Sequence, residues 1–227
     1  MADGEKDLRQ WRLPRGRHGL PRELVIRSQR ERLLAAVVRV TASRGYEATS
    51  VADILEEAGV GRESFYELFN DKQDCLLAAR GILVDHLEGT VREAYAGPEP
   101  WVDRARNALA ATLVWFAGDP AATRVMMVEV MAIGPVFREH FQADLRRFTT
   151  LLDEGLDEAE ASPDLPRATS LAVGGAVARV YEEVIRGRTE ALPSLLPELT
   201  YEMLVPFLGE DAARVEERRA AEMIAAP

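Results

Sequence analysis

The stretch Gly59–Gln73, GVGRESFYELFNDKQ, decides how the rest of the chain is interpreted. Its first glycine permits a sharp turn, and the following residues predict a short helix with Phe65 and Phe69 inward and a polar face outward. Arg62 on that face is suited to bases or phosphates. Such a face stands out in a chain of formal net charge −10, because nucleic acid repels an acidic surface.

The net charge is unevenly distributed along the chain. Residues 1–30 hold eight Lys and Arg against four Asp and Glu, and residues 1–80 hold 14 against 13. The remaining residues therefore carry a net −11. Since total charge governs solubility while a local basic face can still bind DNA, the acidic total does not exclude nucleic acid as a partner.

The composition is that of a folded protein, with 47% hydrophobic and 29% charged residues. A single cysteine, Cys75, excludes an intramolecular disulfide and is typical of a reducing compartment. The first ten residues have no apolar core that would indicate a secretory signal. The longest apolar runs, such as LAVGGAVA, are shorter than the roughly 18 residues of a membrane span. We expect a cytoplasmic protein with no membrane partner.

Apolar residues recur at helical spacing throughout, and neither a period-2 strand pattern nor an internal repeat occurs. A first helix starts at Pro21 and stops at Gly45, and Ser50 begins a second, with Asp53 three residues on as in a capping box. Asp71 can cap a fourth helix. From there the pattern predicts helices over residues 72–95, 101–117, 121–133, 136–159, 167–186 and 194–208.

These elements predict an all-α protein with an N-terminal three-helix domain followed by a larger helical domain. We expect a basic arm over residues 1–21 and the helix-turn-helix domain over residues 22–70. The larger helical domain then covers residues 71–209. Residues 210–227 are charged and alanine-rich, and we expect a frayed tail there.

Two helices joined by a tight glycine turn, the second short and polar on one side, predict a helix-turn-helix. In that motif the second helix enters the major groove and the first crosses the backbone. The stretch TSVADILEEAGVGRESFYELFNDKQDCLLAA resembles the DNA-binding signature of TetR-family transcriptional regulators. The specific match runs from about Arg32 to Ala79, and beyond it only helix number and lengths agree. The resemblance implies a homodimer with an all-helical body, in which a bound small molecule alters the spacing of two recognition helices. It therefore implies an N-terminal three-helix helix-turn-helix domain followed by a helical ligand-binding and dimerisation domain, the latter over residues 71–209.

Five residues are candidates for DNA contact: Ser50, Arg62, Ser64, Tyr66 and Lys72. Arg62 can bond guanine O6 and N7 bidentately. Ser50 and Ser64 lie at helix starts, where hydroxyls and backbone N–H groups suit phosphate oxygens. The resemblance implies that Tyr66 and Lys72 contact phosphates. The alternative is that all five are ordinary capping and surface residues of a helical bundle.

Two further features bear on DNA. Glu63 departs from the family pattern, where small or basic residues are common at this position. Its carboxylate could accept a hydrogen bond from a cytosine amino group, or it could repel phosphate, so Glu63 is not among the candidates for DNA contact.

The arginines of the arm could enter a minor groove, or the arm could be a solvated tail that raises non-specific affinity for DNA.

Aromatic, sulfur-containing and acidic residues on the later helices are candidates for an effector site, since such side chains line small-molecule pockets. They are Trp115, Met126, Glu129, Phe137, Phe141 and Tyr181. The alternative is that each belongs to the ordinary hydrophobic core. Glu129 is a lone acid within VMMVEVMAI; if buried, its carboxylate needs a partner, for which Arg179 or a cationic ligand is the candidate.

A dimer interface is predicted on one face of the helix over residues 167–186, at Leu171, Gly174, Gly175 and Ala178. Two adjacent glycines in a helix interior cost roughly 1 kcal/mol each relative to alanine, which close packing against another backbone explains. The resemblance implies that this helix and the last one pair with their copies in a four-helix bundle.

The sequence offers few residues from which a catalytic site could be built. There are three histidines and one cysteine, with no metal-ligand cluster and no glycine-rich phosphate loop, so we expect neither an enzyme nor a bound metal or cofactor. We predict a DNA-binding transcriptional regulator, a ligand-responsive repressor that binds a palindromic operator in double-stranded DNA as a homodimer. The alternative is a helical small-molecule-binding dimer that has lost specific DNA binding.

Overall fold

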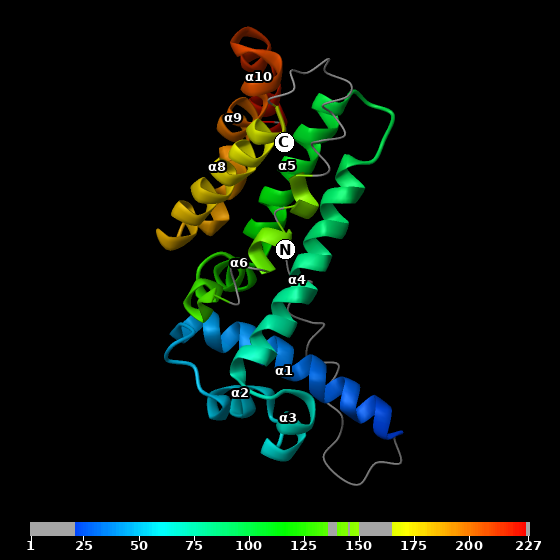
Figure 1. The fold of residues 1–227 in the computed structure, drawn as a ribbon, viewed down its shortest axis with the longest axis vertical. Coiled ribbons are helices and arrows are strands. Elements are labelled where there is room, and N and C mark those ends of the chain that lie inside the picture. The colour runs from blue at the N-terminus through cyan, green and yellow to red at the C-terminus, as the bar shows by residue number, and fades with distance from the viewer. Residues whose placement is uncertain (1–20, 136–139, 145, 150–164, 226–227) are drawn as a thin grey trace.

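The computed structural model describes residues 21–135, 140–144, 146–149 and 165–225, and every regular element in them is a helix. Figure 1 shows these helices in two groups, with α1, α2 and α3 at one end and the remaining helices along and beyond α4. Residues 140–144 and 146–149 are also helical. The elements are α1 (Arg22–Arg44), α2 (Val51–Ala58), α3 (Arg62–Leu68), α4 (Lys72–Tyr95), α5 (Trp101–Gly118), α6 (Pro120–Met127), η1 (Glu129–Ile133), α8 (Leu165–Ile185), η2 (Thr189–Leu195), α9 (Leu196–Leu208) and α10 (Glu210–Ala225).

The first three helices, the start of α4, α6 and η1 contribute to one hydrophobic core. In it, Leu33, Ile54, Phe65 and Leu76 are fully buried, one from each of the first four helices. Cys75 is also buried there, and burial raises the pKa of its thiol to about 12. Because α4 supplies side chains to this core and to the next one, it connects the two groups of helices rigidly.

Local sequence signals set the boundaries of the short helices. The predicted capping box is confirmed: the Ser50 hydroxyl accepts from the Asp53 N–H, and the Asp53 carboxylate accepts from the Ser50 N–H at 2.9 Å. Gly59 ends α2 in the left-handed conformation, with φ of 61°. Asp71 caps α4 by accepting from the Asp74 N–H at 2.8 Å. The turn before α3 therefore forms where the sequence predicts it.

The later helices form a second core, which draws on α4, α5, α8, η2 and α9. The segment predicted as one helix over residues 121–133 is divided here. The α-helix ends at Met127, and the chain tightens into the 3₁₀ helix η1, which Gly134 ends at a φ of 83°. This change of helix type carries Glu129 toward the loop between α1 and α2.

The C-terminal segment is an ordered helix rather than the expected tail. In α10, Ala213 and Ala220 are fully buried, because their small side chains allow close approach to the neighbouring helices. Glu216 is buried beside them and pairs with the buried Arg106 of α5. A buried ion pair of this kind holds α10 in place, since separating its members would leave a charge unpaired. Within the described residues, no helix is long and apolar enough to cross a membrane.

Candidate DNA interface and effector site

The helix α3 presents one face to the core and the other to solvent. Phe65 is fully buried and stacks edge-on against Tyr66, with ring centroids 5.3 Å apart. Arg62, Glu63, Tyr66 and Glu67 are exposed, at positions that share the opposite face of the helix. The aromatic anchor therefore fixes the helix while the polar side chains stay accessible.

Arg62 differs from several of the other exposed arginines of this domain. Among the described residues it has no hydrogen-bond or ion-pair partner, so its guanidinium donors are available to an incoming ligand. Other exposed arginines are engaged with carboxylates: Arg27 with Glu31, Arg39 with Glu57, and Arg44 with Asp53.

The angle between α2 and α3 is fixed by a residue that the sequence did not single out. The guanidinium of Arg32, on α1, donates to the carbonyls of Ala58 and Gly59, the latter at 2.6 Å. A Cβ atom at Gly59 would lie 2.8 Å from Arg32 Nη2. The glycine thus provides both the left-handed backbone and the space for the guanidinium.

Lys72 and Ser50 lie at the edge of this surface with part of their bonding capacity already used. The Lys72 ammonium donates to the carbonyls of Tyr46 and Thr49, both at 2.8 Å, and lies 4.4 Å from the centroid of the Tyr46 ring. Its remaining contact, with the Glu47 carbonyl, is 3.5 Å long. Ser50 directs both its N–H and its hydroxyl to Asp53. Lys72 thus keeps about one donor for a phosphate, whereas Ser50 is committed to its cap.

Ser64 and Tyr66 complete the predicted DNA-contact set. Ser64 is half-buried in the first turn of α3, and Tyr66 is 52% exposed. The structure therefore brings Arg62, Ser64, Tyr66 and Lys72 to one end of the molecule.

An apolar cavity of about 170 Å³ lies within the second group of helices, between α4, α5, α6, α8, α9 and the helical residues Phe141, Asp144 and Phe148. Its charged lining residues are Arg80 and Asp144, which form an ion pair 2.6 Å long. Arg80 is only 6% exposed. The remaining lining is mostly aliphatic and aromatic, and includes Leu87, Leu113, Phe116, Val177 and Met203.

The predicted effector residues divide between this cavity and other places. Met126 and Phe141 line it. Trp115 and Tyr181 are half-buried but are not among the lining residues. Phe137 lies outside the described residues. The sequence missed Arg80 and Asp144, whose pairing joins positions 64 residues apart in the chain and leaves no local pattern.

Glu129 is buried, as the sequence suggested, but the partner proposed for it is wrong. Its carboxylate accepts from the backbone N–H of Tyr46 at 2.9 Å and pairs with Arg124 at 2.9 Å. Arg179 instead bonds Glu183 and Glu198. Glu129 therefore joins η1 to the loop between α1 and α2 and does not face the cavity.

The predicted dimer residues form an exposed stripe on α8. Leu171 is 76% exposed, and Gly174, Gly175 and Ala178 are exposed as well. A Cβ atom at either glycine would meet no atom within 4 Å. No close approach within the protomer explains these glycines. The stripe continues into a groove against α9, lined there by Leu199, Glu202, Val205 and Pro206.

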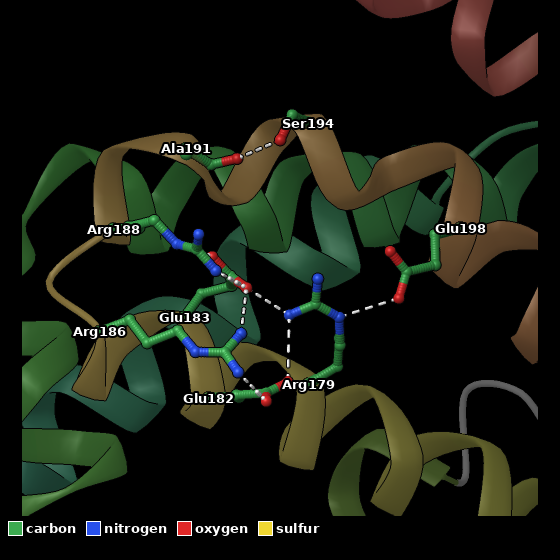
Figure 2. Close-up of polar contacts among 8 residues, drawn as sticks. All are labelled: Arg179, Glu182, Glu183, Arg186, Arg188, Ala191, Ser194 and Glu198. Carbon is green, nitrogen blue, oxygen red and sulfur yellow. Dashed lines mark hydrogen bonds and ion pairs between the residues drawn. The ribbon is translucent and has the colours of Figure 1, made fainter.

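Figure 2 shows an ion-pair network that fixes α8 against η2 and α9. Glu183 bonds both Arg179 and Arg188, and Arg179 also bonds Glu198 of α9 at 2.9 Å. These hydrogen bonds, first from Arg179 and then from Arg188, lower the pKa of Glu183 to about 2. Since Arg179 and Glu198 also line the groove, the network sets the relative position of its two walls.

Comparison with known proteins agrees with this architecture. Residues 33–79 match the family described as "Bacterial regulatory proteins, tetR family". A curated relative from Lactococcus lactis subsp. lactis, an uncharacterised HTH-type transcriptional regulator in the lacX 3′ region, is 25% identical over 133 residues. That alignment covers 54% of this chain and 66% of the relative.

Similar solved structures cover more of the chain. The fatty acid degradation regulator FadR from Bacillus halodurans has a TM-score of 0.69 at 20% identity, covering 78% of this chain and 94% of that one. The transcriptional regulator FadR from Bacillus subtilis, solved in complex with stearoyl-CoA, has a TM-score of 0.68 at 19% identity. The match covers 79% of this chain and 98% of that one. At these identities the likeness establishes the fold. Among the described residues, no group of three His, Cys, Asp or Glu side chains could hold a metal ion.

Proposed function

We propose that this chain, a DNA-binding transcriptional regulator of the TetR family and not an enzyme, is a ligand-responsive repressor that binds a palindromic operator as a homodimer. The observation that carries the proposal is the exposed face of α3, on which Arg62 has no partner among the described residues. A helix anchored by Phe65 and exposing an unpaired arginine beside Tyr66 has the arrangement expected of a recognition helix.

In this proposal Arg62 reads a guanine in the major groove, and Ser64, Tyr66 and Lys72 contact phosphates on either side. Ser50 contributes by capping α2, which sets the position of the turn. Residues 1–20 of the predicted arm lie outside the described residues, and contact of the arm with a minor groove stays a prediction.

Dimerisation through α8 and α9 is supported by the exposed stripe. An apolar side chain as exposed as Leu171, beside two glycines that no atom of the protomer approaches, favours packing against another copy. A twofold dimer presents two copies of α3, and a palindromic operator follows from that symmetry.

For the effector we propose a molecule with an apolar portion that occupies the cavity and a polar group near Arg80. The apolar lining supports this, and so does the stearoyl-CoA complex of the Bacillus subtilis relative. Met126 and Met127, at the end of α6, line the cavity, and Glu129 follows two residues after Met127. A ligand that displaces α6 would therefore act on the contact between Glu129 and Tyr46.

Selection of bound duplexes from a random library tests the proposal. We expect a recurring palindromic sequence, bound with an affinity that falls steeply as salt rises. Recovery of no common sequence, together with an intact dimer that binds apolar ligands, would favour the alternative of a ligand-binding protein without specific DNA binding.

A further inference from the structure

The exposed face of α3 carries more negative than positive charge. Arg62 is its one cation, and Glu63 and Glu67 are its two anions. A face that only rested on phosphates would be repelled by both carboxylates. The two glutamates also lie four residues apart, a spacing at which like charges destabilise a helix.

The two glutamates differ in their surroundings. Glu67 lies 4.0 Å from Arg22 at the start of α1, so part of its charge is balanced within the protein. Glu63 has no hydrogen-bond or ion-pair partner among the described residues. Its carboxylate, directly beside Arg62, therefore has its full acceptor capacity available at the surface that approaches DNA.

We propose that Glu63 is a base-reading residue, which accepts a hydrogen bond from the N4 amino group of a cytosine in each half-site. This inference rests on the proposed DNA binding. Cytosine is the base that offers an amino donor in the major groove without an adjacent acceptor. Thymine O4, and guanine O6 and N7, would face the carboxylate with acceptors and be rejected.

The position of Glu63 also defines where the cytosine lies. Arg62 and Glu63 are consecutive residues at the start of α3, so the bases that their side chains reach lie close together. Each half-site should therefore hold a guanine for Arg62 and a cytosine for Glu63 near each other under the start of α3.

A carboxylate in the first turn of a helix also interacts favourably with the helix dipole, and a test has to separate this structural role from base reading. Glu63→Asp keeps the charge in the first turn but shortens the side chain by one methylene. Glu63→Ala removes both the charge and the length of the side chain. Glu67→Ala is the matched control, because it removes the same charge from the same exposed face.

The experiment selects duplexes from a random library with the full-length wild type and the three variants, and then measures affinity by fluorescence anisotropy. We expect Glu63→Ala to lose preference at one position per half-site and to bind the wild-type consensus about 5- to 150-fold more weakly per half-site. Changing that cytosine to thymine should weaken the wild type similarly and affect Glu63→Ala little. Glu63→Asp should behave like Glu63→Ala, and Glu67→Ala should keep the wild-type preference.

Other results would overturn the proposal. If Glu63→Ala binds all sequences more tightly by the same factor, Glu63 only repels phosphate. If its selected sequence equals that of the wild type, Glu63 has no base-reading role. A wild type that enriches no sequence rejects the proposed DNA binding itself, whereas the preceding results leave it intact.

Discussion

The carboxylate of Glu129 accepts a hydrogen bond from the backbone N–H of Tyr46 at 2.9 Å, although the two residues are 83 positions apart. Lys72 holds the same loop from the other side, through the carbonyls of Tyr46 and Thr49. The loop that precedes α2 is therefore fixed by one anion from η1 and one cation from α4.

We expect Glu129→Ala to lower the free energy of unfolding by about 1–3 kcal/mol, because it leaves the Tyr46 N–H without its acceptor. Glu129→Gln keeps an acceptor oxygen and should lose less. Urea denaturation measures both. Glu56→Ala, an exposed carboxylate on α2, is the control and should change stability little. An unfolding curve for Glu129→Ala equal to that of the wild type would show that the contact contributes nothing.

Lys72→Ala should have two separable effects. Loss of two hydrogen bonds to the loop should reduce stability. If the third donor reaches a phosphate in each protomer, the slope of log affinity against log salt should also decrease by roughly 2 for the dimer. Affinity measured from low to moderate salt gives the slope. A stability loss with an unchanged slope would assign Lys72 to the loop alone.

Arg62→Ala should weaken binding to the selected operator by about 1–3 kcal/mol per half-site and relax preference at one base pair. Arg27→Ala, which removes an exposed arginine already paired with Glu31, is the matched control and should keep the base preference. Competition between operator and random duplex separates the possibilities: an equal loss on both would mean that Arg62 contacts only phosphate.

The ion-pair network around Glu183 predicts a dependence of stability on pH. Its pKa is lowered to about 2 in the folded protein, below the ordinary value of 4.5. A carboxyl group with a lowered folded pKa contributes stability that is fully present above pH 4.5 and is lost as pH falls toward 2. The wild type should therefore lose more stability over this interval than Glu183→Gln. Glu190→Gln, an exposed control on η2, should follow the wild type, and parallel curves for Glu183→Gln and wild type would remove Glu183 as the cause.

Features set by neighbouring residues could be predicted from the sequence. The capping box of Ser50 with Asp53 spans three residues, and the left-handed turn at Gly59 requires only the absence of a side chain. The buried face of α3 follows from the spacing of Phe65 and Phe69. For this reason the helix-turn-helix was predictable in detail.

Pairings between distant residues could not be predicted, because they depend on how whole helices pack. Arg32 reaches the carbonyl of Gly59, and Arg80 reaches Asp144, with no local signal in either case. The error at the C-terminus has the same origin. The charged and alanine-rich sequence of α10 resembles a solvated tail. Its buried partner for Glu216 is Arg106 of α5, and this pairing depends on how α5 and α10 pack.

The exposed glycines of α8 give the sharpest test of assembly. A Cβ atom at Gly175 would meet no atom within 4 Å in the protomer, so Gly175→Leu should fold as well as the wild type. In a dimer packed through this face, the added side chain would meet the partner's backbone and force the subunits apart. We expect sedimentation equilibrium to give a monomer where the wild type is a dimer, with affinity for the operator reduced accordingly. Gly89→Leu is the matched control, since Gly89 is a helical, exposed glycine of α4 that also has no atom within 4 Å of its Cβ position. A Gly175→Leu dimer as tight as the wild type would place the interface on another surface.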